Sequence, residues 1–211
     1  MASLHAELMD QTYRWQRHCY DVTRKHYLFG RDRMIRELRS QPGASVLEIG
    51  CGTGRNLALV RRRWPGAMLH GLDISAEMLK SARARLGPDA ALALGDAADF
   101  DARHLFGRDR FDRVVLSYCL SMIPAWEETV IHACGMLKPG GSLHIVDFGT
   151  MEGLPRLVRR ALLVWLARFH VTPRGSLAAH ALMVGGGCGL AGDARSGPGD
   201  YYQQIVLTRQ G

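Results

Sequence analysis

The chain has 211 residues, of which 47% are hydrophobic and 22% charged, so it is long enough for one α/β domain with a substantial core. Its formal net charge is +7. No apolar run reaches the roughly 18 residues that a membrane-spanning helix needs, and no apolar signal segment follows Met1. The five cysteines contain no C-x-x-C pair, so we expect neither a disulfide framework nor a metal site. This cysteine usage predicts a cytoplasmic location.

The first 40 or so residues precede the first strand signal and are expected to form a helical appendage. Tyr13, Arg17, Tyr20, Arg24 and Tyr27 recur at spacings of three or four, which places them on one stripe of a helix. A surface stripe usually carries charged groups alone, and a core stripe usually carries aliphatic ones. The mixture favours a lid over a ligand, although these tyrosines are equally suited to anchoring the appendage on a sheet.

A glycine-rich loop follows the first predicted strand. In "VLEIGCGTGRNLALV" the run Val46–Ile49 reads as a buried strand, and an apolar helical face begins at Leu57. Gly50, Gly52 and Gly54 can adopt positive φ and carry no Cβ, so a ligand can approach the main chain closely. A helix that starts just after such a loop directs free N–H groups at the ligand. The pattern predicts a nucleotide-type site at the carboxyl edge of a parallel sheet.

Three ligand classes compete for this loop. A phosphate-binding P-loop requires Gly-Lys-Ser/Thr, whereas the run here is Gly54-Arg55-Asn56. The dinucleotide fingerprint places its third glycine where Arg55 stands. The spacing G-x-G-x-G, with Glu48 two residues before the first glycine, resembles motif I of class I S-adenosylmethionine-dependent methyltransferases. A glycine turn with no ligand is the remaining alternative.

Two further acids follow at the ends of the next two predicted strands. The predicted strand within "MLHGLDIS" ends in Asp73, 21 positions after Gly52, where an acid can accept hydrogen bonds from both ribose hydroxyls. The alternative for Asp73 is a turn acid or a helix cap, and Ser75 also reads as a cap. The predicted strand within "AALALGDAADF" ends in Gly95-Asp96-Ala97. This resembles the family's acidic contact to the adenine amine.

The remaining pattern alternates strands with helices, which is typical of a doubly wound parallel sheet. The expected fold is a Rossmann-like α/β, seven-stranded and mostly parallel sheet, with an antiparallel last strand implied by the resemblance. The later elements are expected at residues 113–118 (strand), 126–137 (helix, stopped by Pro139-Gly140-Gly141), 142–149 (strand), 189–195 and 201–209 (terminal hairpin).

A basic and apolar helix is predicted over residues 154–170. It carries Trp165 among several leucines, and the stretch between Gly153 and Gly192 contains arginines but no acid. Such a segment suits an anionic surface, either phospholipid headgroups or a nucleic-acid backbone. The alternative is the helix that covers the fifth strand in a fold of this class.

The segments "YDVTRKHYLFGRDR", "EIGCGTGRNL", "GLDIS" and "FHVTPRGSL" together resemble one branch of the methyltransferases, the bacterial enzymes that methylate diacylglyceryl-homoserine in betaine lipid synthesis. The resemblance runs from about residue 9 to residue 177 and does not extend over Ala178 to Gly199. It implies S-adenosylmethionine as cofactor, an aminolipid substrate, peripheral contact with the inner face of an anionic membrane, and a partner enzyme that supplies diacylglyceryl-homoserine. Nucleic acid is not expected as a partner.

The resemblance also implies roles for individual residues. One domain spans 1–211, with a helical lid at 1–40, a cofactor-binding core at 41–150 and a substrate- and membrane-facing part at 151–211. The ends of the fourth and fifth predicted strands supply the substrate-facing candidates, Tyr118, Asp147 and Phe148. Their aromatic rings suit a methylated ammonium, although Phe148 is equally suited to core packing. A neutral amine is already a nucleophile, so a general base is not obligatory. The expected cofactor contacts are Tyr27, Arg31, Glu48, Gly50, Cys51, Gly52, Asn56, Asp73, Ile74, Met78, Asp96, Ala97 and Ser117.

Three alternative functions stay open at this point. A methyltransferase for a soluble small molecule would use the same loop and would need no membrane contact. An RNA methyltransferase fits the charge, but Ser117-Tyr118-Cys119-Leu120 stands where an Asn-Pro-Pro-Tyr-type motif is expected. A module that binds the cofactor without catalysis is the third.

Overall fold

The computed structural model describes residues 28–211. The stripe from Tyr13 to Tyr27, and with it most of the expected lid at 1–40 and the proposed Tyr27 contact, lies outside these residues. The described part of the appendage begins at Leu28 and contains a short helix, α2 (Arg31–Glu37). This helix buries Met34 and Ile35 against the domain, so the end of the appendage is part of the packed structure.

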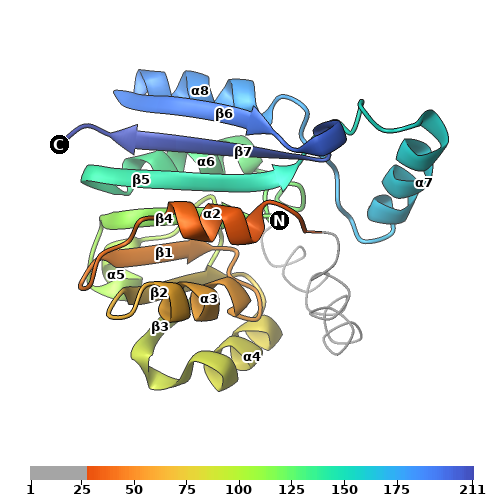
Figure 1. Cartoon of the computed structure of the whole chain (residues 1–211). Helices are drawn as coiled ribbons and strands as arrows, with labels where there is room; N and C mark the ends of the chain where they lie inside the picture. The colour runs from red at the N-terminus through yellow and green to blue at the C-terminus, as the bar shows by residue number, and fades with distance from the viewer. Residues whose placement is uncertain (1–27) are drawn as a thin grey trace.

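Seven strands form one sheet in the order β3-β2-β1-β4-β5-β7-β6 (Figure 1). All neighbours from β3 to β5 pair in parallel, and β7 runs antiparallel to both β5 and β6. The expected Rossmann-like fold with an antiparallel last strand is therefore confirmed. The strands are β1 (Ser45–Ile49), β2 (Met68–Asp73), β3 (Ala90–Leu94), β4 (Phe111–Ser117), β5 (Leu137–Phe148), β6 (Leu190–Ser196) and β7 (Tyr202–Arg209).

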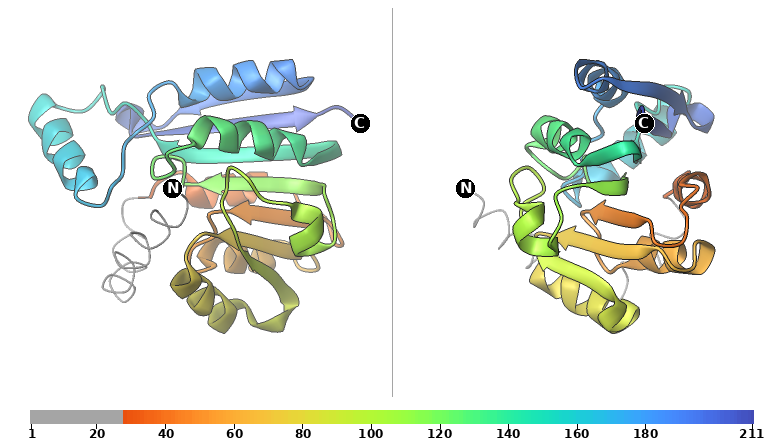
Figure 2. Two further views of the ribbon diagram at one scale, coloured as in Figure 1. Left: turned by 180° about the vertical axis from the view of Figure 1, so that it is seen from behind. Right: turned by 90° about the vertical axis from the view of Figure 1, so that its left-hand side faces the viewer.

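Helices cover both faces of this sheet (Figure 2). One face carries α2, α3 (Arg55–Arg63) and α4 (Ala76–Leu86), and the other carries α5 (Ala102–Phe106), α6 (Trp126–Gly135) and α8 (Leu177–Gly187). Such two-sided cover is the reason that β1 is buried along its whole length.

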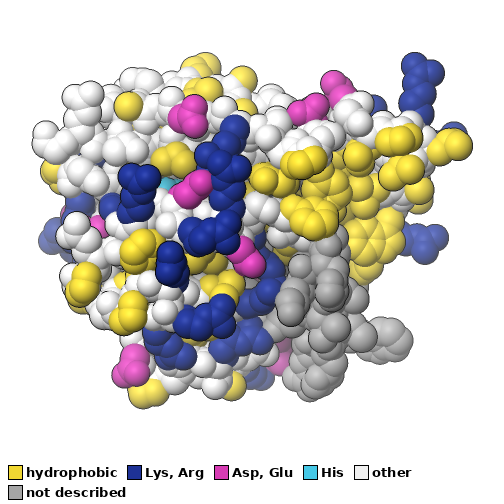
Figure 3. Space-filling model, viewed as in Figure 1, with side chains coloured by type: hydrophobic (Ala, Val, Ile, Leu, Met, Phe, Trp, Pro, Cys, Tyr) yellow, Lys and Arg dark blue, Asp and Glu magenta, His cyan; other side chains and the backbone are white. Residues whose placement is uncertain are grey.

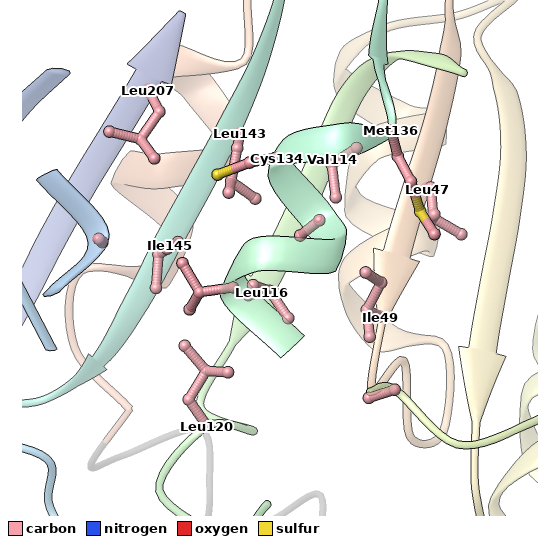
Figure 4. Packing of buried hydrophobic residues seen from close by; sticks show 14 of the residues in the cluster. Leu47, Ile49, Val114, Leu116, Leu120, Cys134, Met136, Leu143, Ile145 and Leu207 are labelled. Atoms are coloured by element: carbon pink, nitrogen blue, oxygen red, sulfur yellow. The ribbon is translucent and has the colours of Figure 1, made fainter. Parts of the chain in front are cut away.

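Each face of the sheet has its own hydrophobic core, because side chains alternate along each strand. Leu47, Leu116 and Ile145 lie on the α6 side and are fully buried (Figure 4). Val46 and Val146, one residue away along their strands, lie in the core on the α2 and α3 side. Glu48 has the same parity as Val46, and this places its carboxyl group on the α3 side at the end of β1.

The region after β5 differs from expectation. The apolar helix at 154–170 is present as α7 (Arg156–Ala167), but it does not cover the fifth strand. It extends beyond the carboxyl end of β5, at the right of Figure 1. Helices α6 and α2 lie against β5, and α8 packs on β6, β7 and α6. The sequence signal for α8 is weak because the helix is apolar on nearly all sides and contains Gly185, whose missing side chain lets α8 approach Leu207 closely.

Element boundaries also shift. The expected helix at 126–137 ends at Gly135, and β5 begins at Leu137 and includes the Pro139-Gly140-Gly141 run. A register irregularity between Phe111 and Arg113 accommodates that run. The terminal hairpin is confirmed as β6 and β7. Over residues 28–211, no helix is both long enough and apolar enough to cross a bilayer.

Candidate cofactor site

The glycine loop joins the ends of three strands. The N–H groups of Gly50 and Cys51 both donate to the carbonyl oxygen of Leu72 near the end of β2, at 2.8 and 2.9 Å. The N–H group of Gly95, after β3, donates to the carbonyl oxygen of Asp73 at 3.0 Å. The loop thus lies at the carboxyl edge, next to the place where β1 and β4 are neighbours and the strand order reverses. Ligands of doubly wound sheets bind at this place.

The three glycines have different functions. All have positive φ, at 71°, 53° and 72° for Gly50, Gly52 and Gly54. A Cβ on Gly50 would lie 2.7 Å from the Cβ of Cys119, and a Cβ on Gly54 would lie 2.8 Å from Leu86 Cδ1. A Cβ on Gly52 would meet no atom within 4 Å. Two glycines are therefore required by packing, and Gly52 alone faces open space that a ligand can fill.

Asp73 holds the centre of this loop. Its Oδ2 accepts from the Gly52 N–H at 2.7 Å, and its Oδ1 accepts from the Ser75 N–H at 2.9 Å. Ser75 caps α4 by accepting from Met78 N, which confirms the cap expected from sequence. A carboxylate has about four acceptor positions, so the bonds to Gly52 and Ser75 do not by themselves prevent Asp73 from accepting ligand hydroxyls. The turn-acid reading and the ribose reading of Asp73 are compatible.

Glu48 and Asn56 form a buried pair at the base of the loop. Asn56 Nδ2, on the first turn of α3, donates to Glu48 Oε1 at 2.7 Å. The second oxygen of each group, Glu48 Oε2 and Asn56 Oδ1, is buried and has no hydrogen-bond partner among residues 28–211. Burial raises the pKa of Glu48 to about 8, and the Asn56 hydrogen bond opposes that rise.

These features test whether the site fits S-adenosylmethionine. Buried polar groups are normally paired, so two unpaired acceptors in one cluster favour a donor from a ligand. The methionyl ammonium of the cofactor is a cation with three donors, and its sugar carries two hydroxyls. Open space at Gly52, acceptor capacity on Asp73 and unpaired acceptors on Glu48 and Asn56 match these groups. The described residues therefore fit the cofactor.

Other expected contacts lie around this cluster. Ile74 is half-buried directly after β2, whereas Met78 is buried on α4. Asp96 accepts from the Ala98 N–H at 3.0 Å and holds a short turn that includes the buried Ala97. Cys51 is buried, and its thiol pKa is well above the ordinary value because of that burial.

Arg31 and Ser117 are two further expected contacts, on α2 and at the end of β4. Arg31 is buried at the start of α2, and its Nε has no acceptor in the described part of the chain. Ser117 Oγ, at the end of β4, is likewise buried and unpartnered within 28–211. Both are polar atoms that a bound ligand can satisfy, and their contacts with the cofactor stay a prediction.

The candidate substrate residues after β4 and β5 are buried. Tyr118 has φ of 54°, and its hydroxyl donates to the carbonyl oxygen of Phe29 at 2.5 Å. Its ring packs edge-on against Phe148, with centroids 4.8 Å apart. Burial raises the pKa of the Tyr118 hydroxyl above its ordinary value. Tyr118 therefore links the start of α2 to the sheet, and contact of either ring with a substrate stays a prediction.

Asp147 anchors the loop that follows β4. Its Oδ2 accepts from the Ser121 N–H at 3.1 Å, and its Oδ1 accepts from the Phe148 N–H at 2.8 Å. Burial raises its pKa to about 6. Because both oxygens are engaged and the side chain is 1% exposed, contact with a substrate ammonium would require this loop to move.

The structure adds residues that the sequence pattern did not indicate. Arg85 Nη1, on α4, donates to the carbonyl oxygen and to Oγ1 of Thr53 at 2.9 and 2.7 Å, and so ties the glycine loop to α4. These residues are 32 positions apart, and no periodic signal links them. The carbonyl oxygen of Ser121 accepts from the Thr172 N–H at 2.8 Å and thereby connects the β4 loop to the segment after α7.

Comparison with known proteins agrees with this geometry. Residues 46–141 match the family model described as a methyltransferase domain. A trans-aconitate 2-methyltransferase of Streptomyces avermitilis is 33% identical over 128 residues, which are 61% of this chain and 47% of that protein. A phosphatidylethanolamine N-methyltransferase of Cereibacter sphaeroides is 34% identical over 132 residues, 62% of each chain. The chain thus spans about half to three fifths of the length of these two relatives.

Solved structures share the fold at low sequence identity. The Haemonchus contortus phosphoethanolamine N-methyltransferase 2, solved with phosphomonomethylethanolamine and S-adenosylhomocysteine, has a TM-score of 0.68 at 15% identity, covering 86% of this chain and 52% of that one. A plantazolicin methyltransferase, solved with a substrate analogue and S-adenosylhomocysteine, has a TM-score of 0.72 at 13% identity, covering 100% of this chain and 98% of that one.

Proposed function

We propose that this chain, which contains a class I S-adenosylmethionine-dependent methyltransferase domain, methylates the amino group of a lipid headgroup, with diacylglyceryl-homoserine as the substrate that the sequence resemblance favours. The observation that carries the cofactor assignment is the open backbone at Gly52 beside Asp73, with unpaired acceptors on Glu48 and Asn56. An amine acceptor is supported by the phosphatidylethanolamine N-methyltransferase relative.

The bound cofactor supplies an electrophilic methyl group on a sulfonium. The chain's own residues hold and orient the reactants. Asp73 and Glu48 fix the loop and the first turn of α3 through hydrogen bonds that exist before any ligand binds, so little rearrangement is needed. Tyr118 and Phe148 form the apolar wall at the ends of β4 and β5 and exclude water there. No residue is required to remove a proton from an amine that arrives neutral.

A second candidate is methylation of a small carboxylic acid. It is favoured by the trans-aconitate methyltransferase relative, at nearly the same identity as the phosphatidylethanolamine relative. The two proposals differ in the group that accepts the methyl, which is a carboxylate that forms an ester in one and an amine in the other. They also differ in where the product is found, in the aqueous phase for the small acid and in the organic phase for the lipid.

Incubation with methyl-labelled S-adenosylmethionine separates the two. Purified protein is supplied in parallel with diacylglyceryl-homoserine, phosphatidylethanolamine or trans-aconitate, and the label is followed by solvent extraction and chromatography. We expect label in the diacylglyceryl-homoserine lipid fraction, and its loss in Asp73→Asn, with Asp99→Asn on the exposed turn as matched control. Label that appears in trans-aconitate and in neither lipid would replace the proposal by the second candidate.

A further inference from the structure

Helix α7 has two unlike faces. Its inner face buries Leu166, packs Leu162 against the core on the α3 side of the sheet, and is held by Arg159 Nε, which donates to the carbonyl oxygen of Thr150 at 3.0 Å. Phe169, just after the helix, packs against the same core. Val171 N also donates to the carbonyl oxygen of Leu166, at 3.2 Å, directly after the helix. The helix is therefore firmly attached to the domain on this side.

The outer face of α7 is apolar and basic together. Leu157 and Val164, seven residues apart and so on one side of the helix, are 83% and 56% exposed. Arg160 and Arg168 are exposed on the same side. Figure 3 shows the yellow side chains gathered over this end of the molecule, with dark-blue ones at their margin. Several exposed apolar side chains grouped on one helix form the kind of patch that marks an interaction surface.

We propose that the outer face of α7 docks on an anionic phospholipid surface, with Leu157 and Val164 entering the boundary between headgroups and acyl chains and Arg160 and Arg168 contacting lipid phosphates. An interfacial helix has this composition, a broad apolar strip flanked by arginine. This inference deepens the proposed function and rests on it only for the identity of the substrate, since docking itself requires no methyl transfer.

The composition of the outer face of α7 disfavours a second copy of the chain or a nucleic acid as its partner. No acid stands between Gly153 and Gly192 in the sequence, and Glu152, just before this stretch, has its Oε1 3.9 Å from Arg159 Nη2. A second copy docked through the same face would bring Arg160 and Arg168 of both copies together without a counter-charge. A nucleic acid would satisfy the arginines but leave Leu157 and Val164 in water. A phospholipid surface satisfies both groups.

The position of α7 would place a docked lipid surface near the cofactor site. The helix follows the carboxyl end of β5 and lies at the same edge of the sheet as Gly52 and Asp73 (Figure 1). A lipid surface on its outer face would bring headgroup amines to the edge where the cofactor site lies. A lipid substrate then needs to rise only partly from the bilayer, which reduces the apolar area that must be exposed to water.

Sedimentation with vesicles tests the inference on the full chain. We expect binding to vesicles that contain phosphatidylglycerol, weak binding to pure phosphatidylcholine, and release at high salt. The double variant Leu157→Ser/Val164→Ser should weaken the partition constant by at least about tenfold. Met183→Ser, at an α8 residue that is 67% exposed, is the matched control and should bind normally.

A charge-matched pair of variants checks the arginines. Arg160→Glu/Arg168→Glu should abolish binding to phosphatidylglycerol vesicles, whereas Arg36→Glu/Arg62→Glu, at exposed residues of α2 and α3 with the same change in net charge, should retain most of it. Equal loss in both pairs would reduce the effect to overall charge and overturn the docking site.

Calorimetry with S-adenosylmethionine, run on each variant, separates this inference from the proposed function and verifies folding. A wild-type chain that binds the cofactor but no vesicle, or whose binding survives Leu157→Ser/Val164→Ser, would refute the docking site and leave the methyltransferase intact. Light scattering that shows a wild-type dimer and a monomeric double variant would assign the face to a second copy. Vesicle binding without cofactor binding would refute the proposed function and leave the docking site intact.

Discussion

The amide of Asn56 and the carboxyl of Glu48 meet at 2.7 Å in the interior, one at the start of α3 and the other at the end of β1. The bond fixes the direction in which α3 leaves the glycine loop. It also leaves one acceptor on each side chain without a partner among the described residues, at the place where the cofactor's ammonium is expected.

Asn56→Leu should destabilise the chain and weaken cofactor binding together. The change removes the donor and leaves Glu48 buried without it, at a cost of about 1–3 kcal/mol. Urea unfolding measures the first effect, and calorimetry with S-adenosylmethionine measures the second. A variant with unchanged stability would show that the hydrogen bond contributes nothing net.

Glu48 should make stability fall with rising pH. Its pKa is about 8 in the folded chain against an ordinary value of 4.5, so between these pH values the folded state holds a proton that the unfolded state has released. The stabilisation is complete below the unfolded value and is lost as pH rises through the folded one. Glu48→Gln is a neutral mimic of the protonated acid. Its free energy of unfolding should therefore increase relative to that of the wild type as pH rises from about 5 to about 8. Denaturant unfolding without cofactor at several pH values checks this, and parallel curves for the two proteins would contradict it.

Two loop glycines should respond differently to alanine. Both have positive φ, which costs an alanine about 1–2 kcal/mol. Gly54→Ala adds a clash at 2.8 Å with Leu86 and should lose about 2–4 kcal/mol in total. Gly52→Ala meets no atom and should lose only the backbone part, yet reduce cofactor affinity by about tenfold or more by filling the ligand's space. Thermal unfolding measures the stability of both variants, and calorimetry measures their affinity for the cofactor. Equal losses of affinity at equal stability would show that Gly52 and Gly54 do not differ in function.

Asp73→Asn should weaken cofactor binding more than it destabilises the fold. An amide oxygen can accept from the Gly52 or the Ser75 N–H but its NH₂ group cannot accept from the other, so one loop bond is lost, at about 1–3 kcal/mol. Affinity should fall by about tenfold or more, because ligand hydroxyls lose an acceptor as well. Calorimetry measures the affinity, and Asp99→Asn should leave it unchanged.

Two variants of Tyr118 distinguish the contribution of its ring from that of its hydroxyl. Tyr118→Phe loses the bond to the Phe29 carbonyl, about 0.5–1.5 kcal/mol, and should retain turnover. Tyr118→Ala also loses the packing on Phe148, about 3–5 kcal/mol, and should lower turnover more than cofactor affinity. Steady-state kinetics with the labelled cofactor provides the comparison. Equal loss of turnover and affinity in Tyr118→Ala would show that the ring belongs to the cofactor site.

The amino-acid sequence alone determined the features that depend on local pattern. Glycine spacing identified the loop after β1, apolar runs bounded by turn residues located the parallel strands, and Ser75 marked the start of α4. Each of these follows from backbone geometry within a few residues, which neighbouring positions specify directly.

Only the tertiary structure decided which surfaces meet. The periodicity of residues 154–170 predicts an amphipathic helix, but it does not say whether a sheet or another surface covers the apolar side. In the structure β5 lies against α2 and α6 instead, and Leu157 is exposed. The bond from Arg85 to Thr53 joins positions 32 apart, and the division of labour between Gly52 and Gly54 depends on where Leu86 packs. Such contacts arise from the folding of distant segments onto one another, and no local pattern encodes them.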